Sequence, residues 1–349
     1  MITPETARDL DVLQNYPPIV DTDGEDAQWL RATPCVRLTF VADGNMTDRS
    51  ARLDDWLARA AELVRPEVTL YGGAGQQIPF SSRRRPKPTD WALFEGLSDR
   101  LAADLRAQRA SADLSIPQES GSFFFGDSLT DGRSATRFFA LWSFPWRVAV
   151  SVSLDLWREK ADEMDALVEE LAALGDVYDS GGYGFAMNWF RPAEDDWARR
   201  LYQPVSERFR LLDLADPQDW RQTKLDSLGA KGVQIAPFPS PVLYPIMPWM
   251  LLGKATLADA GIPEPAIRDL AADVHEVVEH EGGFLIKLWA SPVLGDRDGD
   301  TDLSPAFAVG RALAPAISEG AERFGRSRIA HIGDRREREA WYRRFLPSS

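Results

Sequence analysis

The segment from Gly282 to Ile317 constrains the fold more than any other, because it joins a turn, an apolar strand, an acidic loop and a capped helix. The run 284–289 is bulky and apolar except for Lys287, which predicts a mostly buried strand entered through a glycine turn. Ser304 and Pro305 then supply an N-cap and a first-turn proline. We therefore expect a strand, an acidic loop and a helix in direct succession.

Periodic patterns along the chain predict an α+β fold with antiparallel or mixed sheets and packed amphipathic helices. Apolar residues alternate or run together in the predicted strands, and they recur at helical spacing in the predicted helices. The predicted strands are 36–40, 68–71, 123–125, 136–141, 147–154 and 180–190, with a hairpin at 274–289. The predicted helices are 53–64, 91–105 and 164–174, with two more at the end of the chain.

The 349 residues can form one large domain or two ordinary ones. Residues 1–33 are acidic and proline-containing, so we expect an extended N-terminal lead-in, with the compact fold starting near Val36. Residues 34–346 then form the α+β domain. An alternative divides it into two similar α/β lobes, at about 34–200 and 205–346.

The single cysteine, Cys35, excludes an intrachain disulfide and favours a reducing compartment. The first residues lack the basic end and apolar core of a signal peptide. No window approaches the roughly 18 consecutive apolar residues of a membrane span. We expect a cytoplasmic protein.

The chain carries 40 basic and 54 acidic residues, a net charge of −14 at pH 7. This balance argues against a nucleic-acid-binding protein, because contacts to phosphates need a basic surface. An acidic surface instead favours a basic partner, or it serves only solubility.

The string FFFGDSLTDG (123–132) resembles the first block of the GDSL esterases and lipases, in which the serine is the nucleophile. Ser128 would hold that role. No histidine has an aspartate three residues before it, and no Gly-x-Asn-Asp block supplies an oxyanion-hole asparagine. We favour a polar turn at Asp131-Gly132 and keep a GDSL-like esterase as an alternative.

Two other segments resemble metal-binding patterns and miss them. In HEVVEHE, His275 and His280 are five residues apart, whereas a zincin helix needs four. In GDRDGDTD, an EF-hand loop starting at Asp296 would place Thr301 at its glycine position and Phe307 at its glutamate position. We expect no cofactor, and a calcium-binding or structural module remains an alternative for the acidic loop.

Taken in order, several segments resemble the type VI secretion immunity proteins of the TsiV-like family, which protect against VRR-Nuc nuclease toxins. The resemblance covers nearly all of 36–345, apart from a divergent, proline-rich section at 225–252. Its segments are VRLTF (36–40), FPWRVAVSVSLDLW (144–157), the helix after it, SGGYGFAMN (180–188), GGFLIKLWASPVLGDRDGD (282–300) and WYRRF (341–345).

The resemblance implies a protein that acts by binding, with no chemistry of its own. A nuclease exposes a basic groove for DNA, and an acidic, complementary surface can cover that groove. The partner is then a cognate effector toxin, expected to be a basic nuclease. The densest acidic clusters are the candidate toxin contacts, namely Asp296, Asp298, Asp300 and Asp302 in one loop, and Glu194, Asp195 and Asp196 in another.

Overall fold

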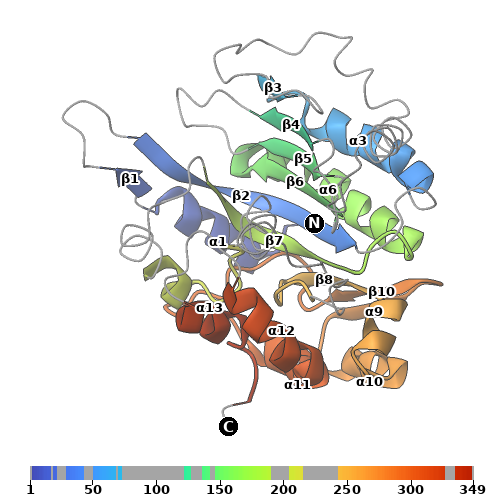
Figure 1. Cartoon of the computed structure of the whole chain (residues 1–349). Coiled ribbons are helices and arrows are strands. Elements are labelled where there is room, and N and C mark those ends of the chain that lie inside the picture. Colours follow the sequence, from blue (N-terminus) through green and yellow to red (C-terminus); the bar gives the residue numbers. More distant parts are fainter. Residues whose placement is uncertain are drawn as a thin grey trace, which may run out of the picture.

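One antiparallel sheet organises the computed structural model (Figure 1). The structure describes residues 2–16, 19–21, 29–42, 50–67, 70–72, 122–126, 136–141, 146–189, 204–214, 243–326 and 335–347. Nine of the ten strands in the described part of the chain follow the order β3-β4-β5-β6-β2-β7-β8-β10-β9, and β1 pairs with β2 outside this path. They are β1 (Ile19–Asp21), β2 (Trp29–Ala42), β3 (Leu70–Gly72), β4 (Ser122–Gly126), β5 (Arg137–Leu141), β6 (Trp146–Ser153), β7 (Ser180–Trp189), β8 (Trp249–Gly253), β9 (Glu276–Glu279) and β10 (Gly283–Lys287).

The predicted α+β class is confirmed, and every pairing between these strands is antiparallel. The sheet continues from residues of the first half into residues of the second, because β7 pairs with β8 and places Tyr183 opposite Trp249. The helices are α1 (Pro4–Gln14), α3 (Asp54–Val64), α6 (Leu154–Leu174), α9 (Lys254–Asp259), α10 (Glu264–Arg268), α11 (Ser304–Ala312), α12 (Ala314–Arg326) and α13 (Arg335–Tyr342), with short 3₁₀ turns at Ser50–Leu53 and Asp269–Ala272. The predicted helix at 91–105 lies outside the described residues.

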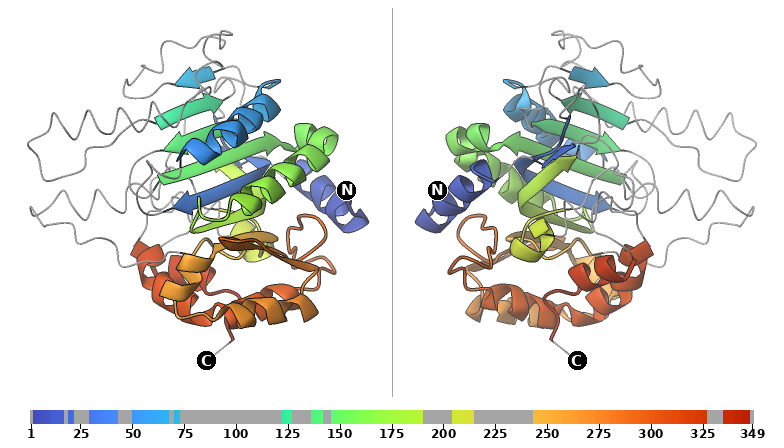
Figure 2. Two further views of the ribbon diagram at one scale, coloured as in Figure 1. Left: turned by 90° about the vertical axis from the view of Figure 1, so that its right-hand side faces the viewer. Right: turned by 90° about the vertical axis from the view of Figure 1, so that its left-hand side faces the viewer.

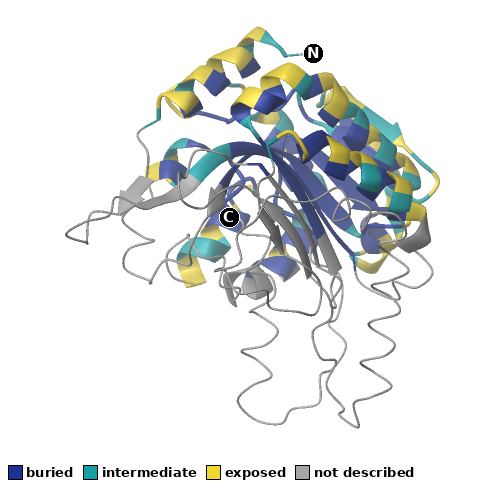
Figure 3. Cartoon of the chain, turned by 90° about the horizontal axis from the view of Figure 1, so that it is seen from above, coloured by how far each residue is buried: buried dark blue, intermediate teal, exposed yellow. Residues whose placement is uncertain are grey.

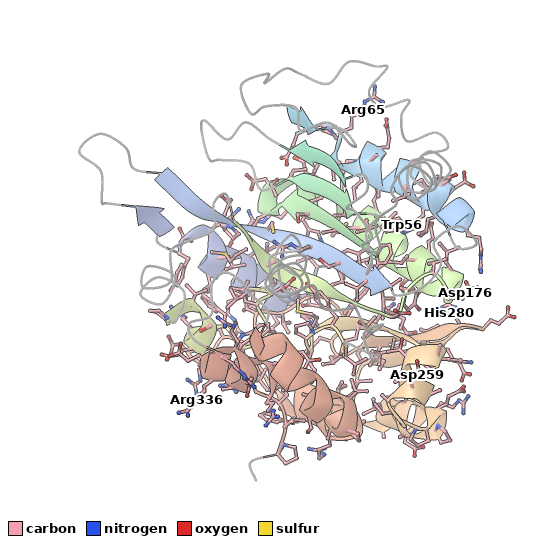
Figure 4. The ribbon with its side chains drawn as sticks, viewed as in Figure 1. Trp56, Arg65, Asp176, Asp259, His280 and Arg336 are labelled. Carbon is pink, nitrogen blue, oxygen red and sulfur yellow. The ribbon has the colours of Figure 1, made fainter. Side chains whose placement is uncertain are left out.

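The main core lies between the sheet and the helices α3 and α6, which cover one face (Figure 2). Side chains alternate along β2, so Leu38 and Phe40 point to this layer. The Phe40 and Trp56 rings pack edge to face with their centroids 5.5 Å apart. The Trp56 indole also donates a hydrogen bond of 2.8 Å to the backbone carbonyl of Leu167 in α6. Figure 4 shows Trp56 inside the molecule, whereas Arg65 and Arg336 lie at its periphery.

The opposite face of the sheet holds a buried polar network. The Arg37 guanidinium lies 3.3 Å from the Asp213 carboxylate and donates a 2.6 Å hydrogen bond to the Met187 carbonyl. The Tyr244 hydroxyl donates to the same carboxylate at 2.7 Å. Burial raises the pKa of Tyr244 well above its usual value, so the hydroxyl keeps its proton. Because the charged pair is hydrogen-bonded on both sides, it can be tolerated away from water.

Two glycines of β7 let the chain around Met247 approach this face. A Cβ on Gly182 would lie 2.5 Å from the Met247 Cγ, and one on Gly184 would lie 2.7 Å from the Pro248 Cδ. Any side chain at these positions would push that segment away. The glycines of the SGGYG string therefore serve close packing.

The prediction of an extended lead-in before Val36 is wrong for residues 4–14, which form α1. The Thr3 hydroxyl caps the helix by accepting a hydrogen bond from the Thr6 N–H, with proline in the first turn. Leu10 and Leu13 are buried in the main core. Their spacing of three residues places both on one helix face, so this segment folds as part of the domain.

The C-terminal segment is held by buried contacts. The described chain ends in three helices rather than the predicted two, because the stretch after α11 resumes as α12 and α13. The Tyr342 hydroxyl donates to the Leu243 carbonyl at 2.7 Å, and Arg344 donates to the carbonyls of Arg210 and Ile246. The WYRRF string therefore locks the end of the chain onto two distant segments.

The described helices are buried on the side that faces the sheet (Figure 3). Figure 3 shows helices that bury one side and expose the other, as amphipathic helices on a sheet should. Of the helices that the structure describes, none has both the length and the apolar character needed to cross a membrane.

Candidate functional site

A groove of about 560 Å³ opens between the first turns of α1 and the loop that leads into α11. We call it the acidic groove, because three carboxylates and one arginine line it beside a tryptophan and two prolines. Its lining residues are Pro4, Glu5, Arg8, Trp289, Asp300, Asp302 and Pro305.

Helix α1 is fixed in place by its buried face, which leaves the other face for the groove. The Asp9 carboxylate accepts a 2.8 Å hydrogen bond from the Leu294 N–H, just before the acidic loop. Further along, the Arg158 guanidinium donates to Asp11 at 2.9 Å and ties α1 to α6. Glu5 and Arg8 are three residues apart, so they lie near one another on the side of the helix toward the groove.

The first aspartate of the acidic loop holds the loop to the rest of the fold. Asp296 receives two hydrogen bonds of 2.9 Å from the Arg208 guanidinium and one of 3.1 Å from the Asp298 N–H. Burial has the largest single effect and would raise the pKa of Asp296. The hydrogen bonds from Arg208 and the Asp298 N–H, together with the positive charges of Arg208 and Arg8, outweigh it and leave the pKa below its usual value. Its side chain is only 6% exposed, so Asp296 is an anchor of the loop.

The last aspartate of the loop accepts hydrogen bonds from the first residue of α11, and the N-cap position itself is held by Leu303. Asp302 accepts hydrogen bonds from the Ser304 N–H at 2.9 Å and the Ser304 hydroxyl at 2.7 Å. These bonds lower the pKa of Asp302, so it is ionised at neutral pH. The sequence predicted Ser304 as the N-cap, whereas Ser304 is the first helical residue and Asp302 satisfies its N–H. Asp302 is also exposed, which leaves its charge available to the groove.

The groove contains more carboxylates than cationic side chains. Within the described part of the chain, Glu5 and Asp300 have no cation at ion-pair distance, and Arg8 has no carboxylate at that distance. Trp289 is half-buried, and its backbone carbonyl is fixed by a 2.9 Å hydrogen bond from the Trp249 indole. The arrangement places an aromatic residue beside exposed carboxylates, which suits a positively charged group.

The predicted toxin-contact residues therefore differ in their position relative to the groove. Asp300 and Asp302 line the acidic groove, whereas Asp298 is exposed outside its lining and lies 3.4 Å from Arg208. Asp296 is buried and paired, which corrects its prediction as a contact residue, because a carboxylate held by Arg208 inside the fold presents little surface to a partner. Glu194, Asp195 and Asp196 lie outside the described residues.

The sequence reasoning missed the contribution of α1 and Trp289 to this site. The composition of residues 1–33 predicts a lead-in, so it indicates neither Glu5 nor Arg8 as a site residue. The signal was present in the Thr3-Pro4-Glu5 start, which is a typical helix N-terminus. Trp289 was assigned to a buried strand, and only the end of β10 at Lys287 places it at the surface.

The other motifs do not assemble a second site among the described residues. The segment 275–281 is an edge strand and turn, with His280 at the tip of the β9–β10 hairpin, near the end of the sheet (Figure 4). The described residues contain no group of three or more His, Cys, Asp and Glu side chains that could hold a metal ion. Ser128 of the GDSL-like string lies outside the described residues.

No protein-family model and no curated protein sequence matches the chain. The fold and the groove define an α+β protein with one antiparallel sheet and an acidic surface site. Among solved structures, the chain is similar to the type VI secretion system protein PA0821 of Pseudomonas aeruginosa. The two are 15% identical, with a TM-score of 0.62 over 95% of this chain and 86% of that chain. This likeness shows a shared fold.

Proposed function

We propose that this chain is an immunity protein of a type VI secretion system, which binds a basic toxin and blocks its active or substrate-binding site. The observation that carries the proposal is the acidic groove, where Glu5, Asp300 and Asp302 outnumber a single arginine beside Trp289. The fold that the chain shares with a type VI secretion system protein supports the same assignment.

The negative net charge of the chain is suited to rapid association with a basic toxin. An immunity protein must bind its toxin before damage occurs, so a fast association rate matters. Opposite charges raise association rates toward about 10⁸–10⁹ M⁻¹s⁻¹ at low salt. A net charge of −14 would steer a basic nuclease toward this surface. A nuclease acts where DNA is, so we place the encounter in the cytoplasm.

Coexpression with the protein encoded beside this gene tests the proposal. We expect the neighbouring protein to arrest growth when expressed alone, and this chain to restore growth and copurify with it. A neighbouring protein that is toxic but neither neutralised nor copurified would exclude the immunity function. Nuclease activity measured on the purified pair would show whether binding blocks the substrate site.

A further inference from the structure

We propose that the acidic groove receives the side chain of one arginine that projects from the basic surface of the partner protein. This inference rests on the function proposed above and names the chemical group that the site recognises. The groove offers apolar walls at Pro4, Trp289 and Pro305, with carboxylates from Glu5 and the acidic loop beside them. A side chain with an apolar stem and a charged end matches both parts.

The groove is open to solvent and has room for a side chain that projects from a partner. Its volume is about 560 Å³. The two lining prolines come from different elements, Pro4 from α1 and Pro305 from the start of α11. Both walls are anchored, because Asp9 binds the Leu294 N–H and Asp302 caps Ser304. A preformed pocket loses little entropy when a side chain enters it.

Arginine fits this site better than lysine. The guanidinium is planar, so it can stack on the indole of Trp289 while its N–H groups reach carboxylates in pairs. An ammonium group is more strongly hydrated and has no flat face. Cation–π attraction to a tryptophan is also the strongest among the aromatic side chains.

The positive charge of Arg8 provides a second test of arginine binding in the groove. This exposed arginine lines the groove, and its Nη2 lies 3.8 Å from the position that a Cβ on Gly299 would take. Its charge opposes the entry of another cation. Replacing it with glutamine should therefore tighten the binding of arginine, whereas a purely structural groove would not respond in this direction.

NMR titration of the full chain with N-acetyl-arginine amide tests the proposal without the toxin. The indole N–H signal of Trp289, assigned by its loss in Trp289→Phe, should shift saturably, with a dissociation constant on the order of 1–10 mM. N-acetyl-citrulline amide, which has the same shape without the charge, should bind at least tenfold more weakly. Equal shifts with both compounds, or no saturable shift, would overturn the inference.

Matched variants locate the binding. Asp300→Asn with Asp302→Asn should weaken arginine amide binding about tenfold and Arg8→Gln should strengthen it, because each changes the charge at the groove. The control pair is Asp269→Asn with Asp273→Asn, which removes the same charge from exposed positions outside the groove. Equal losses in both pairs would show general charge screening and refute a specific site.

The two proposals can fail separately. If the neighbouring toxin binds the wild type and the Asp300→Asn, Asp302→Asn variant with equal affinity, the groove inference fails and the immunity function stands. If arginine amide binds but no toxin is neutralised, the groove recognises arginine and the immunity function fails.

Discussion

Asp9 in the first helix accepts a 2.8 Å hydrogen bond from the backbone N–H of Leu294, 285 positions away in the sequence. This bond joins α1, which contributes Glu5 and Arg8 to the groove, to the segment just before the acidic loop. Asp9 is 1% exposed. Burial raises its pKa to about 6, against the lowering effects of the Leu294 N–H and Arg8.

The raised pKa predicts how stability depends on pH. With a pKa of about 6 when folded and 3.8 when unfolded, the native state binds more protons between these values. The Asp9 contribution to the free energy of unfolding therefore falls as the pH rises through this window. Asp9→Asn keeps an acceptor for Leu294 and removes the charge, so it should stabilise the protein by up to about 3 kcal/mol at pH 7.

Urea unfolding of wild type and Asp9→Asn between pH 4 and 7 measures this difference, which should shrink toward the acid end. Asp11→Asn, on the exposed face of the same helix, should change stability by only a few tenths of a kcal/mol. An Asp9→Asn variant that is less stable than wild type at pH 7 would show that the carboxylate charge is favourable there.

Removal of Arg208 should destabilise the acidic loop. Arg208→Ala leaves the buried Asp296 carboxylate without its cation. Because the Arg208 side chain is itself 35% exposed, water screens the pair, and we expect a cost of about 1–3 kcal/mol. Because the pKa of Asp296 is lowered, the stabilisation by this pair is present above the usual carboxyl pKa of 3.8 and is lost as the pH falls through the lower native value. Chemical unfolding at pH 7 and pH 3 checks both statements, with exposed Arg297→Ala as the control.

A methyl group on Gly310 should loosen the C-terminal segment. Its Cβ would lie 2.1 Å from the carbonyl oxygen of Phe345, so one of the two segments must shift. We expect Gly310→Ala to lower the free energy of unfolding by about 1–3 kcal/mol through overpacking, although alanine favours a helix by about 1 kcal/mol.

Gly299→Ala is the matched control for that substitution, since its Cβ would meet only ordinary contacts at 3.4 Å. Limited proteolysis should cut the C-terminal segment faster in Gly310→Ala alone. Equal stability and equal protection in both variants would contradict tight packing of α11 against Phe345.

Charge at the groove should act on the rate of toxin capture. Asp300→Asn with Asp302→Asn should slow association with the neighbouring toxin by roughly tenfold at low salt, and the difference should shrink at high salt. Stopped-flow measurements at two salt concentrations check this. An association rate that stays the same at low salt would remove the groove from the encounter surface.

Several elements could be predicted from the sequence because their signals are local. The alternation of β6, the helical spacing of α6 and the glycine entry to β10 all arise from neighbouring residues. The side-chain contacts of Lys287, in contrast, involve residues from other elements of the fold. Its ammonium group binds Glu169 at 2.7 Å and Glu276 at 2.9 Å, and it lies 4.6 Å from the centre of the Trp249 ring. Glu276 lies opposite Lys287 in the predicted hairpin, whereas Glu169 in α6 and Trp249 in β8 cannot be identified from the strand pattern itself.

The candidate site likewise has features that the sequence predicts and features that only packing decides. An acidic loop before a capped helix was visible in the sequence, and two of its aspartates do line the groove. The sequence gives no reason to distinguish the four aspartates at 296, 298, 300 and 302, because their spacing contains no information about burial. The difference between Asp296, bound by Arg208, and Asp300, open to the groove, comes from packing against a segment far away in the chain.

By itself the sequence determined the α+β class, most strand positions, the helices α3 and α6, the acidic character and the place of the acidic loop. These properties depend on composition and on contacts within a few residues. The tertiary structure alone decided that α1 belongs to the core, that one continuous sheet joins both halves, and that Glu5 and Trp289 meet Asp300 at one groove. The physical reason is that burial and charge pairing depend on which distant segments come together, and this becomes defined only when the chain packs.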